Sequence, residues 1–140
     1  MRHKYSFERL NVWNDSRELV KEIYKVSGTF PSKETYALCS QIQRAVISIP
    51  SNIAEGMGRL SEKEQVRFLE NAFGSTMEVY CQLMLSVDLG YLSQDKFDEI
   101  VVLLDRVANK INALSKSIKS RFTDSPINRL TASPIQRLTD

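Results

Sequence analysis

The sequence predicts an all-α fold, an up-down antiparallel four-helix bundle with a non-helical C-terminal repeat tail. Apolar residues recur at spacings of three and four in four long stretches, the pattern of helices that each bury one face. Short connections containing Gly, Pro and Ser separate these stretches, so consecutive helices should lie antiparallel. At 140 residues and 42% hydrophobic content, the chain is long enough for one core. We predict a bundle over residues 1–119, with helices at about 8–27, 34–56, 61–89 and 93–119, and an extended tail over 120–140.

The first predicted helix, residues 8–27, follows a short basic arm. Gly28 is a candidate cap at its C-terminal end, and Phe30-Pro31 leads into the second helix. The apolar face of the first helix is formed by Leu10, Trp13, Leu19, Val20, Ile23, Tyr24 and Val26.

The second predicted helix, residues 34–56, has the clearest apolar stripe of the chain. Pro50 lies inside it, and because apolar residues keep helical spacing on both sides, we expect a kink, the alternative being a break near Ser48. Gly56 and Gly58 are expected to take the left-handed conformation that ends a helix. The stripe consists of Leu38, Ile42, Val46, Ile49, Ile53 and Met57.

The third and fourth predicted helices begin at serine caps. Ser61 with Glu64 three residues later is a capping-box pattern, and Ser93 opens the fourth helix. Gly74 and Ser75 interrupt the third helix, where glycine costs about 1 kcal/mol relative to alanine. We expect a neighbouring helix to approach closely there.

The tail contains an eight-residue repeat, SPINRLTA followed by SPIQRLTD. A period this short, with a proline in each unit, does not form packed repeat units. Its role is either a short linear motif or none, the second case being a tandem DNA repeat translated past the domain's natural end.

A polar stripe runs along the second helix beside the apolar one. Ser48 and Asn52 compete with the helix backbone for hydrogen bonds, which is unusual for a stripe that only faces water. We therefore expect this stripe to have partners. It consists of Gln41, Arg44, Ser48, Asn52, Glu55 and Arg59.

Composition excludes several functional classes. The formal net charge is +2, so the chain has no global basic field of the kind that marks a nucleic-acid binder. His3 is the only histidine, which excludes a multi-histidine metal site, and both Cys39 and Cys81 are expected to be small buried hydrophobes. No secretory or membrane-spanning segment is present, and we expect a cytoplasmic protein without cofactor or metal.

These residues carry a resemblance to a known family. The chain resembles the small four-helix-bundle proteins encoded by intervening sequences within bacterial 23S ribosomal RNA genes, over Phe7 to about Lys116. The first matching block is Gln41 to Ala45 running into Ser48, Pro50, Asn52, Glu55, Gly56 and Arg59; the second is Phe68, Leu69, Ala72, Gly74, Ser75 and Glu78; the third is Phe30-Pro31. The resemblance implies an up-down bundle that forms a homo-oligomer, pentameric in relatives, with no known catalysis. A distant relative is the accessory protein of diversity-generating retroelements, a basic pentameric barrel that partners a reverse transcriptase and nucleic acid.

Three functions are compatible with these observations. The first is a homo-oligomeric scaffold or binding module, accessory to a nucleic-acid enzyme or with weak, nonspecific nucleic-acid binding. The second is a helical adaptor for a protein partner without nucleic acid. The third and weakest is an enzyme using Arg44, Glu55 and Glu78, because no nucleophile, metal cluster or phosphate loop accompanies them.

Two further expectations concern charged residues. We expect Arg44 to pair with an acidic residue across a helix or subunit contact, with Glu78 the first choice and Glu55 the second. Symmetry could also gather small basic clusters into a rim that contacts phosphate. The candidate rim residues are Arg2, Lys4, Arg9, Arg59, Lys63 and Arg67.

Overall fold

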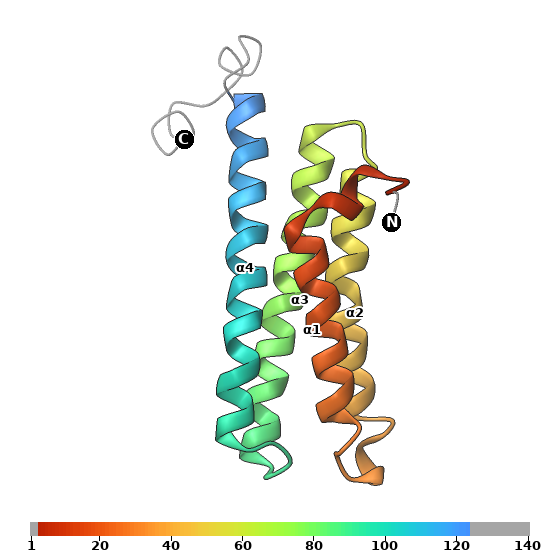
Figure 1. Cartoon of the computed structure of the whole chain (residues 1–140), viewed down its shortest axis with the longest axis vertical. Coiled ribbons are helices and arrows are strands. Elements are labelled where there is room, and N and C mark those ends of the chain that lie inside the picture. Colours follow the sequence, from red (N-terminus) through yellow and green to blue (C-terminus); the bar gives the residue numbers. More distant parts are fainter. Residues whose placement is uncertain (1–2, 124–140) are drawn as a thin grey trace.

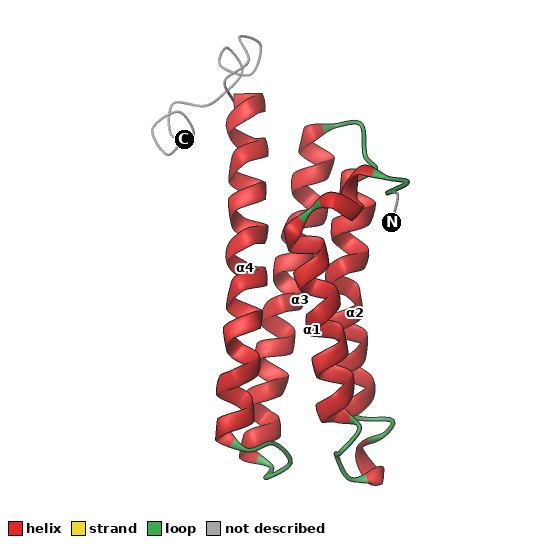
Figure 2. Ribbon diagram, viewed as in Figure 1, coloured by secondary structure: helices red, strands yellow, loops and turns green. Residues whose placement is uncertain are grey.

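The computed structural model describes residues 3–123, and its four long helices are α1 (Asn11–Ser27), α2 (Leu38–Met57), α3 (Glu62–Asp88) and α4 (Gln94–Thr123). Two short 3₁₀ turns, η1 (Ser6–Arg9) and η2 (Ser32–Glu34), precede α1 and α2. All regular elements within this range are helical (Figure 2). The repeat tail beyond Thr123 lies outside the described residues.

The helices run alternately up and down, and each packs against its neighbours in the chain (Figure 1). α1 also packs against α4, which closes the bundle, and the contact between α2 and α3 is the most extensive. The predicted all-α four-helix bundle is therefore confirmed.

The apolar stripe of α2 forms the centre of the core. Ile42, Val46, Ile49 and Ile53 are completely buried, while Leu38 and Met57 at the two ends are partly buried against the core. Burying an isoleucine side chain contributes about 1.5 to 3 kcal/mol. The hydrophobic spacing alone located this element correctly, and α2 is continuous through Pro50.

Helix ends differ from the prediction at three places. Leu10 is extended, so the turn Ser6–Arg9 is separate from α1, and a second turn delays α2 until Leu38. α4 continues to Thr123, four residues beyond the predicted end. Periodicity does not fix helix ends to within a few residues.

The serine caps are present as predicted. The Ser61 hydroxyl accepts the backbone N–H of Glu64 at 3.3 Å, and the Ser93 hydroxyl accepts that of Lys96 at 3.2 Å. The Glu64 carboxylate binds Arg67 and not the backbone of Ser61, so only the serine half of the predicted capping box is formed.

The expectation that Gly56 and Gly58 are left-handed is wrong, because Gly90 is the only described glycine with positive φ. Gly56 lies inside α2 and is buried, and a Cβ atom placed on it would be 2.8 Å from the Cβ of Phe68. Gly56 is therefore needed for the close approach of α2 and α3.

Two expectations for α3 are also wrong within one chain. A Cβ atom on Gly74 would meet no atom within 4 Å, so Gly74 faces outward and no helix of the same chain approaches it closely. Cys39 is buried as predicted, but Cys81 is exposed, because it lies on the same outward side of α3 as Gly74.

Within residues 3–123, no helix combines the length and apolar character needed to cross a membrane.

Candidate interface on helices α2 and α3

The polar stripe of α2 meets α3 at two serines. The Ser48 hydroxyl lies 2.8 Å from the Ala45 carbonyl and also bonds the hydroxyl of Ser75. One turn later, the Asn52 amide donates to the Ser48 carbonyl at 2.8 Å. The structure thus joins Ser48 to Ser75, two residues from different parts of the sequence motif, and these bonds account for the middle of the stripe.

Arg44 and Gln41, at the start of the stripe, are exposed. Arg44 makes no ion pair with another residue in the described part of the chain. Glu55 pairs with Arg59 at 3.0 Å, and the Glu78 carboxylate accepts a weak bond from Gln82 at 3.5 Å. Within one chain the predicted pairing of Arg44 with Glu78 or Glu55 is therefore wrong, and pairing with Glu78 or Glu55 of another subunit stays a prediction.

The C-terminal end of the stripe surrounds Phe68. Its ring is buried on α3, and the guanidinium groups of Arg59 and Arg67 each lie 4.7 Å from the ring centroid. Gly56 packs directly against the same residue. Gly56, Phe68 and Arg59, which come from two blocks of the motif, thus form the joint between the end of α2 and the start of α3.

The helix-three residues of the motif divide between core and surface. Ala72 is fully buried, Ser75 is half-buried, and Gly74 and Glu78 are exposed. Nearby, Gln82 Oε1 is buried and has no hydrogen-bond partner within the described residues. The motif residues of α3 thus contribute both to the core and to the outward face of the helix.

Two residues of the candidate basic rim, Arg59 and Arg67, are paired with carboxylates. Arg67 binds Glu64 at 2.8 Å, which lowers the pKa of the Glu64 carboxyl and raises the pKa of Arg67. Arg59 is paired with Glu55, as described above. Lys4, Arg9 and Lys63 are exposed, and Arg2 lies outside the described residues. Nucleic-acid binding at this rim stays a prediction.

The turn η1 is held by Glu8. Its carboxylate accepts the backbone N–H groups of Tyr5 at 2.6 Å and Lys4 at 2.8 Å, and these bonds lower its pKa. The turn places Phe7 edge-on against Trp13, with ring centroids 4.9 Å apart.

We expect this turn to loosen in acid. A depressed carboxyl pKa contributes stability that is present above the ordinary value of 4.5 and is lost as pH falls through the native pKa. Because Trp13 is the only tryptophan, its emission should change below that pH while helical circular dichroism stays constant. Glu8→Ala should shift the emission at neutral pH and show no further acid transition. Identical emission from wild type and Glu8→Ala at neutral pH would contradict this role.

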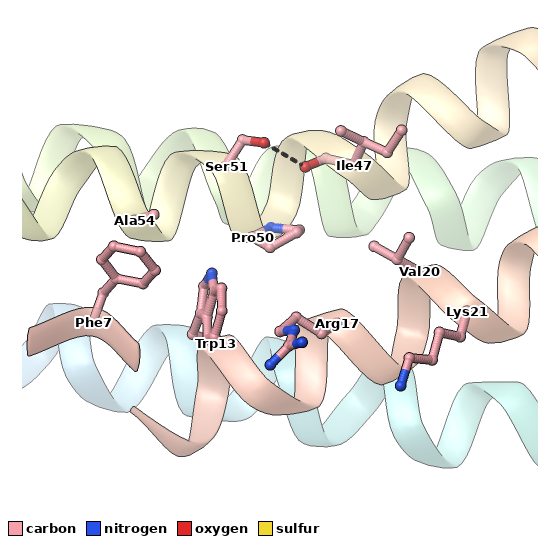
Figure 3. Close-up of a pocket in the computed structure, with 9 residues that line it drawn as sticks. All are labelled: Phe7, Trp13, Arg17, Val20, Lys21, Ile47, Pro50, Ser51 and Ala54. Atoms are coloured by element: carbon pink, nitrogen blue, oxygen red, sulfur yellow. Dashed lines mark hydrogen bonds between the residues drawn. The ribbon is translucent and has the colours of Figure 1, made fainter. Parts of the chain in front are cut away.

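A groove between α1 and α2 was not predicted from the sequence. It has a volume of about 470 Å³ and an almost entirely apolar surface (Figure 3). The Trp13 ring points across it toward α2. Trp13 and Val20 on α1, and Ile47 and Ala54 on α2, are apolar pairs with a spacing of seven, and these pairs were the available signal. The groove is lined by Phe7, Trp13, Arg17, Val20, Lys21, Ile47, Pro50, Ser51 and Ala54.

Among residues 3–123, no group of three or more His, Cys, Asp or Glu side chains is placed to hold a metal ion. The carboxylates suggested for the weakest alternative, Glu55 and Glu78, are both exposed. Glu55 is engaged with Arg59. The described residues thus form surfaces suited to contact with another molecule, and the carboxylates suggested for catalysis are not gathered in a cleft.

These features define an antiparallel four-helix bundle in which residues of the two main motif blocks meet between α2 and α3, through Ser48 with Ser75 and through Gly56 with Phe68. The family model for the 23S rRNA-intervening sequence protein matches residues 8–113. The chain belongs to this family, which confirms the resemblance seen in the sequence.

One similar solved structure is the crystal structure of a protein with unknown function from the S23 ribosomal protein family, from Bacteroides thetaiotaomicron VPI-5482. The two share 20% identity with a TM-score of 0.70, over 75% of this chain and 98% of that chain. At this identity the likeness supports the fold alone. No curated protein matches the chain.

Proposed function

We propose that this protein is a non-catalytic scaffold that assembles with copies of itself, in the ring of five that the family resemblance implies. The observation that carries the proposal is the outward side of α3. Met77, Met84 and Leu85 are 41%, 46% and 46% exposed, and they lie on one side of the helix with the open position at Gly74. Adjacent exposed apolar side chains of this kind are typical of a contact surface.

Charge on the neighbouring helix supports the same proposal. Arg44 on α2 lacks a carboxylate partner among the described residues, and Glu78 on α3 has only Gln82. Both are exposed, so each is available to a second copy. The sequence predicts that Arg44 pairs with Glu78, and this pair is absent within one chain. An ion pair between Arg44 of one copy and Glu78 of another would fulfil that prediction.

The scaffold does not require nucleic acid. Arg59 and Arg67, the two arginines nearest the α2–α3 turn, are already bound to Glu55 and Glu64. Compensated cations release few counterions from a phosphate backbone and so contribute little affinity. Self-assembly is therefore the better supported part of the proposal.

A charge swap tests the proposed pair. Arg44→Glu and Glu78→Arg should each reduce assembly, because each places like charges opposite one another across the contact. The double variant should recover it, since the pair is restored with reversed sign. Assembly is measured by sedimentation velocity at constant protein concentration.

The matched control is Arg106→Glu, which changes the same charge at an exposed position on α4. It should assemble like wild type. If both single variants assemble like wild type, the two residues are not at a contact. If the singles fail and the double variant also fails, both residues matter but they do not pair with each other.

A further inference from the structure

We propose that the α1–α2 groove of one copy receives the outward side of α3 of the next copy, so that the contact is head-to-tail. This inference rests on the proposed self-assembly and specifies its two surfaces. We call the second surface the outer stripe of α3; it consists of Gly74, Met77, Cys81, Met84 and Leu85, all of which are exposed.

The two surfaces match in shape. The groove is concave and apolar, whereas the outer stripe follows one side of a helix, with no side chain at Gly74. Trp13 to Val20, Ile47 to Ala54 and Met77 to Met84 each span seven residues, or about 10 Å of helix. An apolar helix side laid in a groove between two helices is a common mode of recognition.

The two surfaces also match in charge. Residues 70–88 of α3 contain three acidic residues and no Lys or Arg. Glu70 is paired with Lys119 at 3.3 Å, which leaves Glu78 and Asp88 without a cation among the described residues. A surface that complements this side of α3 must therefore be apolar, to cover the outer stripe, and must carry a cation to pair with a carboxylate of α3.

Arg17 supplies the cation on the groove side. Its guanidinium lies 4.7 Å from the centroid of Trp13, and its one described hydrogen bond is a weak one to Asn14 at 3.4 Å. Lys21 is paired with exposed Glu18 at 3.0 Å. Arg17 is thus a positive charge at the edge of an apolar surface, without a carboxylate in the described part of its own chain.

Because the groove and the outer stripe are different surfaces, each copy can use both at once. Such a heterologous contact repeats from copy to copy and closes into a ring when the rotation permits. The groove packed against a second groove would instead give a closed dimer. The two arrangements differ in which substitutions disrupt them.

The test uses one disrupting substitution on each surface. Ile47→Asp places a charge in the groove and Met77→Asp places one on the outer stripe; the two side chains are 44% and 41% exposed, so the bundle should still fold. Val102→Asp, at a side chain that is 62% exposed on α4 and outside both surfaces, is the control. Circular dichroism confirms folding, and sedimentation equilibrium over rising concentration gives the mass.

We expect wild type and Val102→Asp to be oligomeric, and each surface variant alone to sediment as a monomer of 16.0 kDa. A mixture of the two surface variants should give dimers of twice that mass and nothing larger. Each mixed pair retains one intact groove and one intact outer stripe, which allows a single contact.

The other outcomes separate this inference from the proposed function. A monomeric wild type would overturn both. An oligomeric wild type with both surface variants still assembled would leave self-assembly standing and remove these surfaces. Loss of assembly in Ile47→Asp alone would show that the groove meets something other than α3. A mixture that stays monomeric would show that the two surfaces do not bind each other.

Discussion

Replacing Phe68 by alanine should lower the free energy of unfolding by about 3 kcal/mol, the lower end of the range for a buried phenylalanine. The side chain is 7% exposed and lies outside the contiguous central core, in the joint between α2 and α3. Its loss removes the surface on which Arg59 and Arg67 stack and opens a cavity beside Gly56. Urea unfolding followed by circular dichroism measures the change.

Two variants separate packing from charge at this joint. Phe68→Leu keeps most of the apolar volume and should cost less than half as much as Phe68→Ala. Arg67→Ala removes an exposed stacking partner and a surface ion pair, which contribute little, so it should change the unfolding free energy by less than about 1 kcal/mol. A larger effect from Arg67→Ala than from Phe68→Ala would show that the ring is not the principal contact.

Gly56→Ala should lower the free energy of unfolding by about 1 to 3 kcal/mol, the usual cost of overpacking. The added Cβ atom would lie 2.8 Å from the Cβ of Phe68 and 3.4 Å from the Gln65 carbonyl oxygen. Because Phe68 Cβ is fixed to the backbone, α2 and α3 must move apart. This result is opposite in sign to helix propensity, which favours alanine by about 1 kcal/mol.

Gly74→Ala is the matched control, since its added Cβ atom meets no atom of the chain within 4 Å. It should leave the unfolding free energy unchanged or raise it. Both glycine variants are compared in the Ile47→Asp chain, so that self-association does not add to the measured stability. Equal destabilisation by the two substitutions would show that the close approach at Gly56 has no special cost.

The sequence was sufficient for the fold because its strongest signals are local and periodic. The spacing of Ile42, Val46, Ile49 and Ile53 located the buried face of α2, and the hydroxyl of Ser61 marked the start of α3. Both signals depend on helix geometry alone. The family was found separately, through the resemblance of the motif blocks, and the family model over residues 8–113 confirmed it.

The roles of the two motif glycines were not predictable in this way. A glycine permits either a left-handed turn or a close helix approach, and only the distance to a neighbouring helix decides between them. Gly56 proved to be a close approach and not the expected left-handed turn, and within one chain Gly74 is open where a close approach was expected. Cys81 was misplaced for a different reason: helix three carries apolar residues on more than one side, so its sequence does not show which side is buried.

The site was predicted in part. The polar stripe was expected to have partners, and Ser48 has one in Ser75 of α3, which the sequence did not name. The periodicity of α1 did not reveal that Trp13 and Arg17 line a groove with Pro50. That groove forms only when α1 and α2 are placed side by side and η1 carries Phe7 against Trp13. Such features depend on tertiary packing, which no single stretch of sequence specifies.

The most direct test of self-assembly is the mass of the full chain in solution, measured by light scattering at micromolar concentration. The proposed ring predicts a mass of five times 16.0 kDa, unchanged on moderate dilution. A mass of 16.0 kDa across that concentration range would contradict the proposed scaffold, because the exposed apolar side chains of α3 would then not contact a second copy of the chain.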